Sequence, residues 1–213
     1  MHYSPSAFNS LPSLKAAEEN FNVKEARQFL EGPIRQAFLD FGVQEKYGIA
    51  LLHNHFPLQA NQRLVDYRNT ATAWLVDDEV SPVSTKYNGQ IVPRAYMFEK
   101  DDIVPYEFSF VSAAENDGVT DVATDVQFFN VLNQTLTSLG LEKLFGVRDL
   151  RDHDNNLGVE ITEGEANIML PHDGTHSPSE LIEALWVFGP KTAPCYCLCY
   201  CARSCGRHWR CHC

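Results

Sequence analysis

Cysteine is absent from the first 194 residues of this 213-residue chain. Disulfides and thiolate metal sites within that part of the molecule are therefore excluded. Long apolar runs are also missing: no stretch approaches the roughly 18 residues of a membrane-spanning helix, and no basic segment followed by an apolar leader opens the chain. We expect an intracellular, soluble protein, cytoplasmic or nuclear, without a membrane partner.

The motifs of nucleotide-dependent enzymes are absent as well. The chain has no G-x-G-x-x-G opening a helix, no G-x-x-x-x-G-K-[ST] loop, no G-x-S-x-G elbow and no H-E-x-x-H. We therefore expect no nucleotide cofactor. Basic residues are scarce: the first 190 residues hold 13 Lys and Arg against 28 Asp and Glu. Such an acidic body repels phosphate, which argues against nucleic-acid binding.

Length and composition favour one folded body. With 213 residues, 44% hydrophobic and 21% charged, the chain is long enough for one sizeable core but short for two domains. The expected divisions are a loose N-terminal arm at residues 1–20, a single α+β domain at 21–190 and a Cys-rich basic tail at 191–213. Oligomeric state is not encoded in these patterns.

Apolar periodicity predicts the elements of the body. A helix interrupted at Gly32-Pro33 and closed by Gly42 is followed by a strand at 47–56. Two hairpins are expected, with strands at 91–99 and 104–111 and then within 159–170, and a helix at 121–139 between them. A capping box from Ser177 to Glu180 predicts a last helix. Because these elements lack a βαβ rhythm, we expect an α+β fold with a mixed or antiparallel sheet and helices packed on one side.

The tail carries the sharpest chemical signal. It contains every cysteine of the chain and two histidines but no carboxylate: Cys195, Cys197, Cys199, Cys201, Cys205, Cys211, Cys213, His208 and His212. In an extended strand, the first four cysteines would line one edge. Thiolates suit Zn(II) or Cu(I), so the tail is a candidate metal site. Its Cys-x-Cys run resembles metallothioneins over about nineteen residues, although Tyr196, Tyr200 and Trp209 depart from those aromatic-poor chains.

The body offers an alternative metal site. His53 and His55 share one face of a predicted strand, and a second group, His172, Asp173 and His176, lies in a loop. Two histidines and a carboxylate could bind Fe(II), Mn or Zn. The H-x-H after Gly48 slightly resembles the cupin metal motif, but no Glu follows at the expected spacing. In the other interpretation these histidines are ordinary polar residues of a strand and a loop.

Residues 47–56, with Leu64-Val65, resemble segments of uncharacterised proteins of filamentous fungi, a resemblance that implies no established activity. Three functional hypotheses remain. The first is an accessory or interaction module whose tail binds zinc or copper. The second is a small metal-dependent enzyme that uses His53, His55 and His176, with Tyr106 and Phe108 lining its pocket. The third is a nonenzymatic protein that recognises an acidic partner surface through Arg203, Arg207 and Arg210, or whose tail is disordered and has no function.

Overall fold

The computed structural model describes residues 3–76, 86–100, 102–112, 122–150, 158–189 and 195–203. The strands in these ranges are β1 (Tyr47–Leu51), β2 (Gln62–Tyr67), β3 (Thr70–Leu75), β4 (Gly89–Glu99), β5 (Asp102–Ser112), β6 (Phe145–Asp149), β7 (Gly158–Glu163), β8 (Ala166–Pro171), β9 (Leu181–Phe188) and β10 (Cys195–Ala202). The helices are α1 (Pro5–Asn9), α2 (Leu14–Val23), α3 (Arg27–Phe29), the π-helix η1 (Leu30–Ile34), α4 (Arg35–Phe41), the short 3₁₀ helices η3 (Val122–Asp125) and η5 (Pro178–Glu180), and α6 (Val126–Ser138).

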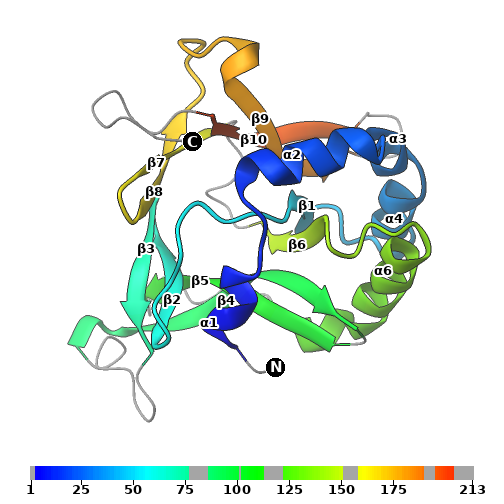
Figure 1. Cartoon of the computed structure of the whole chain (residues 1–213). Helices are drawn as coiled ribbons and strands as arrows, with labels where there is room; N and C mark the ends of the chain where they lie inside the picture. Colours follow the sequence, from blue (N-terminus) through cyan, green and yellow to red (C-terminus); the bar gives the residue numbers. More distant parts are fainter. Residues whose placement is uncertain are drawn as a thin grey trace.

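The strands close into a barrel in the order β1-β6-β4-β5-β2-β3-β8-β7-β10-β9 (Figure 1). Most neighbours are antiparallel, whereas β2 pairs with β5 and β7 pairs with β10 in parallel. The α+β fold that the sequence predicts, a sheet with helices packed on one side, is therefore wrong. Hydrophobic alternation indicates which faces of a strand are buried, but closure depends on which distant strands pair, here β3 with β8 and β1 with β9.

The predicted last helix is also wrong. The capping box at Ser177 and Glu180 is present, but it starts only the short helix η5, and the apolar run after it forms β9. This strand is buried on both faces: Ile182, Trp186 and Phe188 pack toward the helices, while Leu185 and Val187 pack with apolar residues of β1 and β10. A mostly apolar run is compatible with a central strand as well as with a buried helix. Here the pairing with β1 and β10 makes it a strand.

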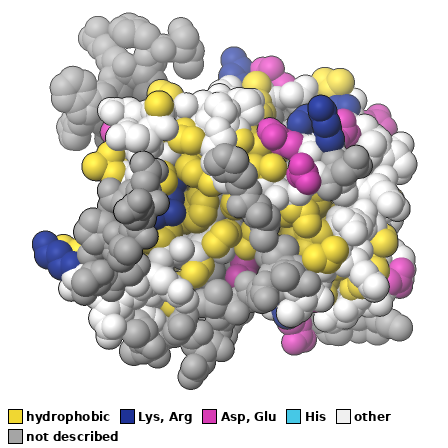
Figure 2. All heavy atoms as spheres, turned by 90° about the horizontal axis from the view of Figure 1, so that it is seen from below, with side chains coloured by type: hydrophobic (Ala, Val, Ile, Leu, Met, Phe, Trp, Pro, Cys, Tyr) yellow, Lys and Arg dark blue, Asp and Glu magenta, His cyan; other side chains and the backbone are white. Residues whose placement is uncertain are grey.

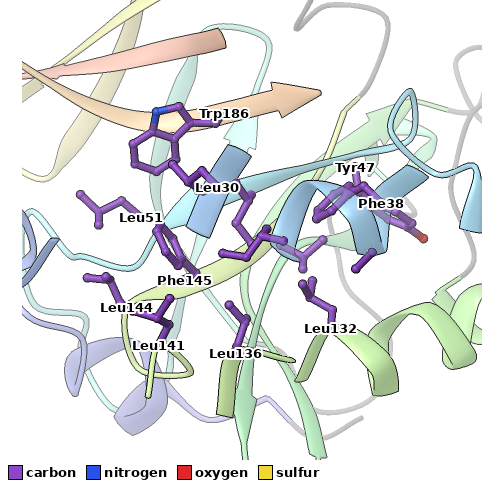
Figure 3. Close-up of a cluster of buried hydrophobic side chains, with 14 of the residues drawn as sticks. Leu30, Phe38, Tyr47, Leu51, Leu132, Leu136, Leu141, Leu144, Phe145 and Trp186 are labelled. Carbon is purple, nitrogen blue, oxygen red and sulfur yellow. The ribbon is translucent and has the colours of Figure 1, made fainter. Parts of the chain in front are cut away.

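The helices cover one part of the barrel and form the larger core with it. Figure 1 shows α2, α3, α4 and α6 on the side of the molecule near β1 and β6. Phe38 of α4, Tyr47 of β1 and Phe145 of β6 are completely buried there, together with Leu132 and Leu136 of α6 (Figure 3). Every residue of β1 is buried, because one face meets this core and the other meets the barrel interior.

The N-terminal segment, expected to be loose, contains α1 and part of α2. Ala7, Phe8 and Leu11 are buried and pack with side chains of β4 and β5. Asn54 holds this segment: its side-chain amide donates to the carbonyl oxygen of Leu11 (2.9 Å), and its backbone N–H donates to that of Pro12 (2.9 Å).

Figure 2 shows hydrophobic side chains gathered in the middle of the face seen from below in the view of Figure 1. No helix within the described ranges has the length and apolarity needed to cross a membrane.

Candidate metal centre

Four side chains that can ligate a metal lie together: His53, His55, Glu160 and Cys201. One ligand atom from each lies within 4.8 Å of the other three. Nε2 of His53 is 3.0 Å from Nε2 of His55 and 3.4 Å from Sγ of Cys201. Oε1 of Glu160 is 2.8 Å from Nε2 of His55 and 3.7 Å from Sγ of Cys201. This group could hold a metal ion.

The separations suit a tetrahedral ion. With metal–ligand bonds of about 2.0–2.3 Å, the ligand atoms of a tetrahedral zinc site lie about 3.3–3.8 Å from one another. Two of the four distances, 3.4 and 3.7 Å, fall in that range, and the other two, 3.0 and 2.8 Å, would lengthen by a few tenths of an ångström. All four ligand atoms lie within 4.8 Å of one another, so the group is close to the spacing of a tetrahedral site.

Both histidines follow the end of β1, and their backbone is fixed from two sides. Nδ1 of His53 is 2.8 Å from the carbonyl oxygen of Leu51. Because a carbonyl oxygen only accepts, Nδ1 carries the proton, and Nε2 of the neutral ring keeps its lone pair toward Cys201. Asn54, between the two histidines, donates a hydrogen bond to the N-terminal segment, and its backbone forms a parallel β-bridge with Ser13. The arm and the strand together set the position of the H-x-H.

The other two ligands come from neighbouring strands. Cys201 of β10 and Glu160 of β7 are direct partners in the parallel register, so their side chains lie on the same face of the sheet. The Cys201 side chain is buried, and Glu160 is 16% exposed. This pairing joins the tail to a body strand far away in sequence and places a soft sulfur beside a carboxylate.

The electrostatics of the group reflect its burial. Burial lowers the pKa of His53 to about 4, and repulsion from His55 contributes to the shift. Burial alone would raise the pKa of Glu160, but its hydrogen bond and attraction to His55 outweigh this and lower that pKa to about 2. A hydrogen bond with Cys199, burial and the charge of Glu160 raise the pKa of the Cys201 thiol well above its usual value. A bound cation reverses this preference, since a coordinating thiol is deprotonated outright.

The first four tail cysteines do not line one edge, contrary to the expectation for a straight strand. Register shifts between β10 and β9 at Cys197–Cys199 and Cys199–Tyr200 interrupt the alternation. Cys195 and Cys197 consequently pack with the helical core, where burial raises their pKa values to about 11 and about 12. Cys199 and Cys201 instead line a cavity. The remaining predicted tail ligands, Cys205, Cys211, Cys213, His208 and His212, lie outside the described residues.

The second predicted body group lies apart from the centre. The half-buried His172 packs against the ring of Tyr200, with ring centroids 5.6 Å apart. Asp173 accepts hydrogen bonds from the N–H and hydroxyl of Thr175, whose hydroxyl also lies 3.3 Å from Nδ1 of His176. Among the residues described, the four-member metal group includes none of these three. Arg203, expected to recognise a partner, forms an ion pair with Glu18 of α2, whereas Arg207 and Arg210 are not among the described residues.

Sequence reasoning missed Glu160. Glu160 stands between the apolar residues Val159 and Ile161 of the predicted hairpin within 159–170, and a carboxylate in that position is a signal that could have been noted. Its distance from the histidines in sequence gave no reason to connect them. The link is made by β10, which pairs with β7 and brings Cys201 to Glu160.

A cavity adjoins the centre. It offers about 70 Å³ to water-sized molecules and is lined by His53, Glu160 and Cys201, with side chains from strands around the barrel. Because β1, β5, β6, β7, β8, β9 and β10 all contribute, the cavity lies in the barrel interior. Tyr106 lines it, while Phe108 lines a second cavity beyond.

In comparisons with known proteins, no family model matches the chain, and no similar curated protein or solved structure was found.

Proposed function

We propose that this protein binds one zinc ion through His53, His55, Glu160 and Cys201, and that the ion interacts with a small molecule bound in the adjoining cavity. The supporting observation is the convergence of four different ligand atoms within 4.8 Å, from three separate segments of the chain. The proposal assigns the metal to the barrel rather than to the tail alone.

The donor set selects among metals. Two nitrogens, one oxygen and one sulfur suit the borderline-soft Zn(II), for which Cys, His and Glu are all ordinary ligands. Cu(I) favours sulfur, and calcium and magnesium require oxygen shells, so each would leave part of this donor set poorly used. Of these ions, zinc is the one for which all four groups are ordinary ligands.

The neighbouring cavity favours a chemical role over a purely structural one. Three of the four ligands, His53, Glu160 and Cys201, line the cavity, so a small molecule there lies beside the ion. Bound zinc can polarise a carbonyl or lower the pKa of a water molecule. The second candidate function is structural, and the four protein ligands favour it: a closed zinc site would tie the segment after β1 to β7 and β10.

Metal analysis of four proteins tests the proposal: the full chain, a chain shortened by residues 204–213, and the single variants His53→Ala and Cys201→Ser. The shortened chain keeps β10 and Cys201 but loses the last three cysteines. We expect one zinc per molecule in the full and shortened chains and much less in both variants. Zinc that disappears with residues 204–213 but persists in His53→Ala would instead place the metal in the tail.

Cobalt substitution then separates the two candidate roles. A small exogenous ligand such as azide should change the absorption spectrum of the cobalt-loaded protein if the ion is open to the cavity. An unchanged spectrum would support the structural role.

A further inference from the structure

A second cavity adjoins the one beside the metal centre. The second cavity offers about 50 Å³, and the two share the side chains of Glu107, Arg148, Glu160 and Met169 as walls. The second also reaches the exposed Arg68 at the turn between β2 and β3. A path of polar side chains therefore runs from the metal centre through the barrel toward this turn.

The charges along this path balance only when the metal is absent. The charged side chains that line the two cavities are three carboxylates and three guanidiniums: Asp66, Glu107, Glu160, Arg68, Arg94 and Arg148. Adding Zn²⁺ and converting Cys201 to a thiolate leaves one net positive charge. Burial raises the pKa of Glu107, and protonation of this group would make the interior still more positive. The loaded barrel therefore favours an anion, although the whole chain carries a formal charge of −11.

Arg148 is placed to receive that anion. Its Nη1 is 3.0 Å from Oε2 of Glu107, and its side chain lines both cavities. A guanidinium has five N–H donors in a planar fork that matches a carboxylate, so it can serve a ligand and Glu107 together. His53, Glu160 and Cys201 of the metal centre line the same cavity as Arg148, so a carboxylate in this cavity would have two attractive partners.

Part of the wall of the first cavity is apolar. Ala50, Ala184, Leu185 and Leu198 line it, and Leu185 and Leu198 belong to one buried cluster. Since one water molecule requires at least about 10–15 Å³, the first cavity, with about 70 Å³, holds about five water-sized groups. A ligand of this size has a charged end and a short hydrocarbon end.

We propose that the barrel binds a short-chain aliphatic monocarboxylate, with its carboxylate between the metal centre and Arg148 and its hydrocarbon chain against Leu185 and Leu198. This inference rests on the proposed function, because the zinc ion supplies the positive charge that the metal-free barrel lacks. By linkage, the carboxylate must also strengthen zinc binding by the same factor.

Calorimetric titration of sodium butyrate into zinc-loaded and zinc-free protein tests the inference. We expect the zinc-loaded protein to bind butyrate at least 10-fold more tightly than the zinc-free protein does. Butyramide, which has the same shape without the charge, should bind the loaded protein at least 10-fold more weakly than butyrate. Equal binding of the two compounds, or equal binding with and without zinc, would overturn the inference.

Two variants identify the binding groups. Arg148→Met should lose butyrate binding, whereas Arg27→Met, which removes an exposed guanidinium on α3, should retain it. Ala184→Val, which adds two methyl groups at the apolar end, should weaken butyrate more than acetate. Each variant is first shown to bind zinc like the wild type, so that a misfolded protein is not counted. Unchanged butyrate binding in Ala184→Val would overturn the placement of the hydrocarbon chain against the apolar wall.

The failure of this inference is distinct from the failure of the proposed function. If the protein binds zinc at His53 and Cys201 but does not bind butyrate, the metal centre stands and the carboxylate inference is refuted. If the protein binds no zinc at these residues, both the metal centre and the carboxylate inference are refuted.

Discussion

Glu160→Gln is the perturbation that most directly measures the metal centre. The variant keeps the size of the side chain and can still hydrogen-bond to His55, but it removes the negative charge that zinc requires. If zinc binds only the folded protein, free zinc at 100 times the dissociation constant stabilises the fold by about 2.7 kcal/mol. For a chain of this size, 1 kcal/mol corresponds to about 2–4 °C in melting temperature, so the wild type should gain about 5–11 °C.

The variant should lose most of that gain. If removing the carboxylate weakens zinc binding about 100-fold, the same zinc concentration stabilises the variant by only about 0.4 kcal/mol, or about 1–2 °C. The assay is thermal unfolding followed by circular dichroism, with zinc and with a chelator. Glu163→Gln is the matched control, because Glu163 is an exposed carboxylate on the same strand, β7. A zinc-induced increase in Glu160→Gln as large as in the wild type would refute the assignment of Glu160 as a ligand.

Three further predictions concern the scaffold. Asn54→Ala should weaken zinc binding about 10-fold without unfolding the protein, because Asn54 holds the backbone between the two histidines; competition with a chromophoric chelator measures this. Asn9→Ala, which removes the arm's contacts to Leu58, is the control, and an equal loss there would contradict a specific role for Asn54. Gly146→Ala should destabilise the fold by about 1–3 kcal/mol in urea unfolding, because the added Cβ would lie 2.5 Å from the carbonyl oxygen of Tyr96. Gly158→Ala should cost less, because its Cβ meets the flexible Met169 side chain; the reverse order would contradict this explanation. Burial alone would raise the pKa of Asp125, but hydrogen bonds from Lys46 and Tyr47 outweigh it and lower that pKa. Since the folded pKa lies below the unfolded one, the stabilisation by Asp125 is present above the unfolded pKa and is lost as the pH falls through the folded pKa. The urea midpoint of the wild type should therefore approach that of Asp125→Asn between about pH 6 and about pH 3, and a constant difference would contradict this.

Local signals predicted several elements well. The two hairpins occur as β4–β5 and β7–β8, the helix at 121–139 occurs as η3 and α6, and Gly42 ends α4 in the left-handed conformation. These features depend on neighbours in the sequence: turn residues, apolar spacing and positive φ at glycine. The predicted last helix was wrong because the mostly apolar residues Leu181–Phe188 fit either a helix or a buried strand, and only pairing with β1 and β10 distinguishes the two.

The sequence by itself determined the chemical inventory of this protein: a pair of histidines two residues apart, a cysteine-rich end and an acidic body. It also specified most of the short-range elements. Only the tertiary structure decided that the strands close into a barrel, that Cys201 lies beside His53, and that Glu160 completes the group. The physical reason is that a ligand set is a property of distances in space, and residues 53, 160 and 201 become neighbours through the pairing of β7 with β10 and the closure of the barrel beside β1.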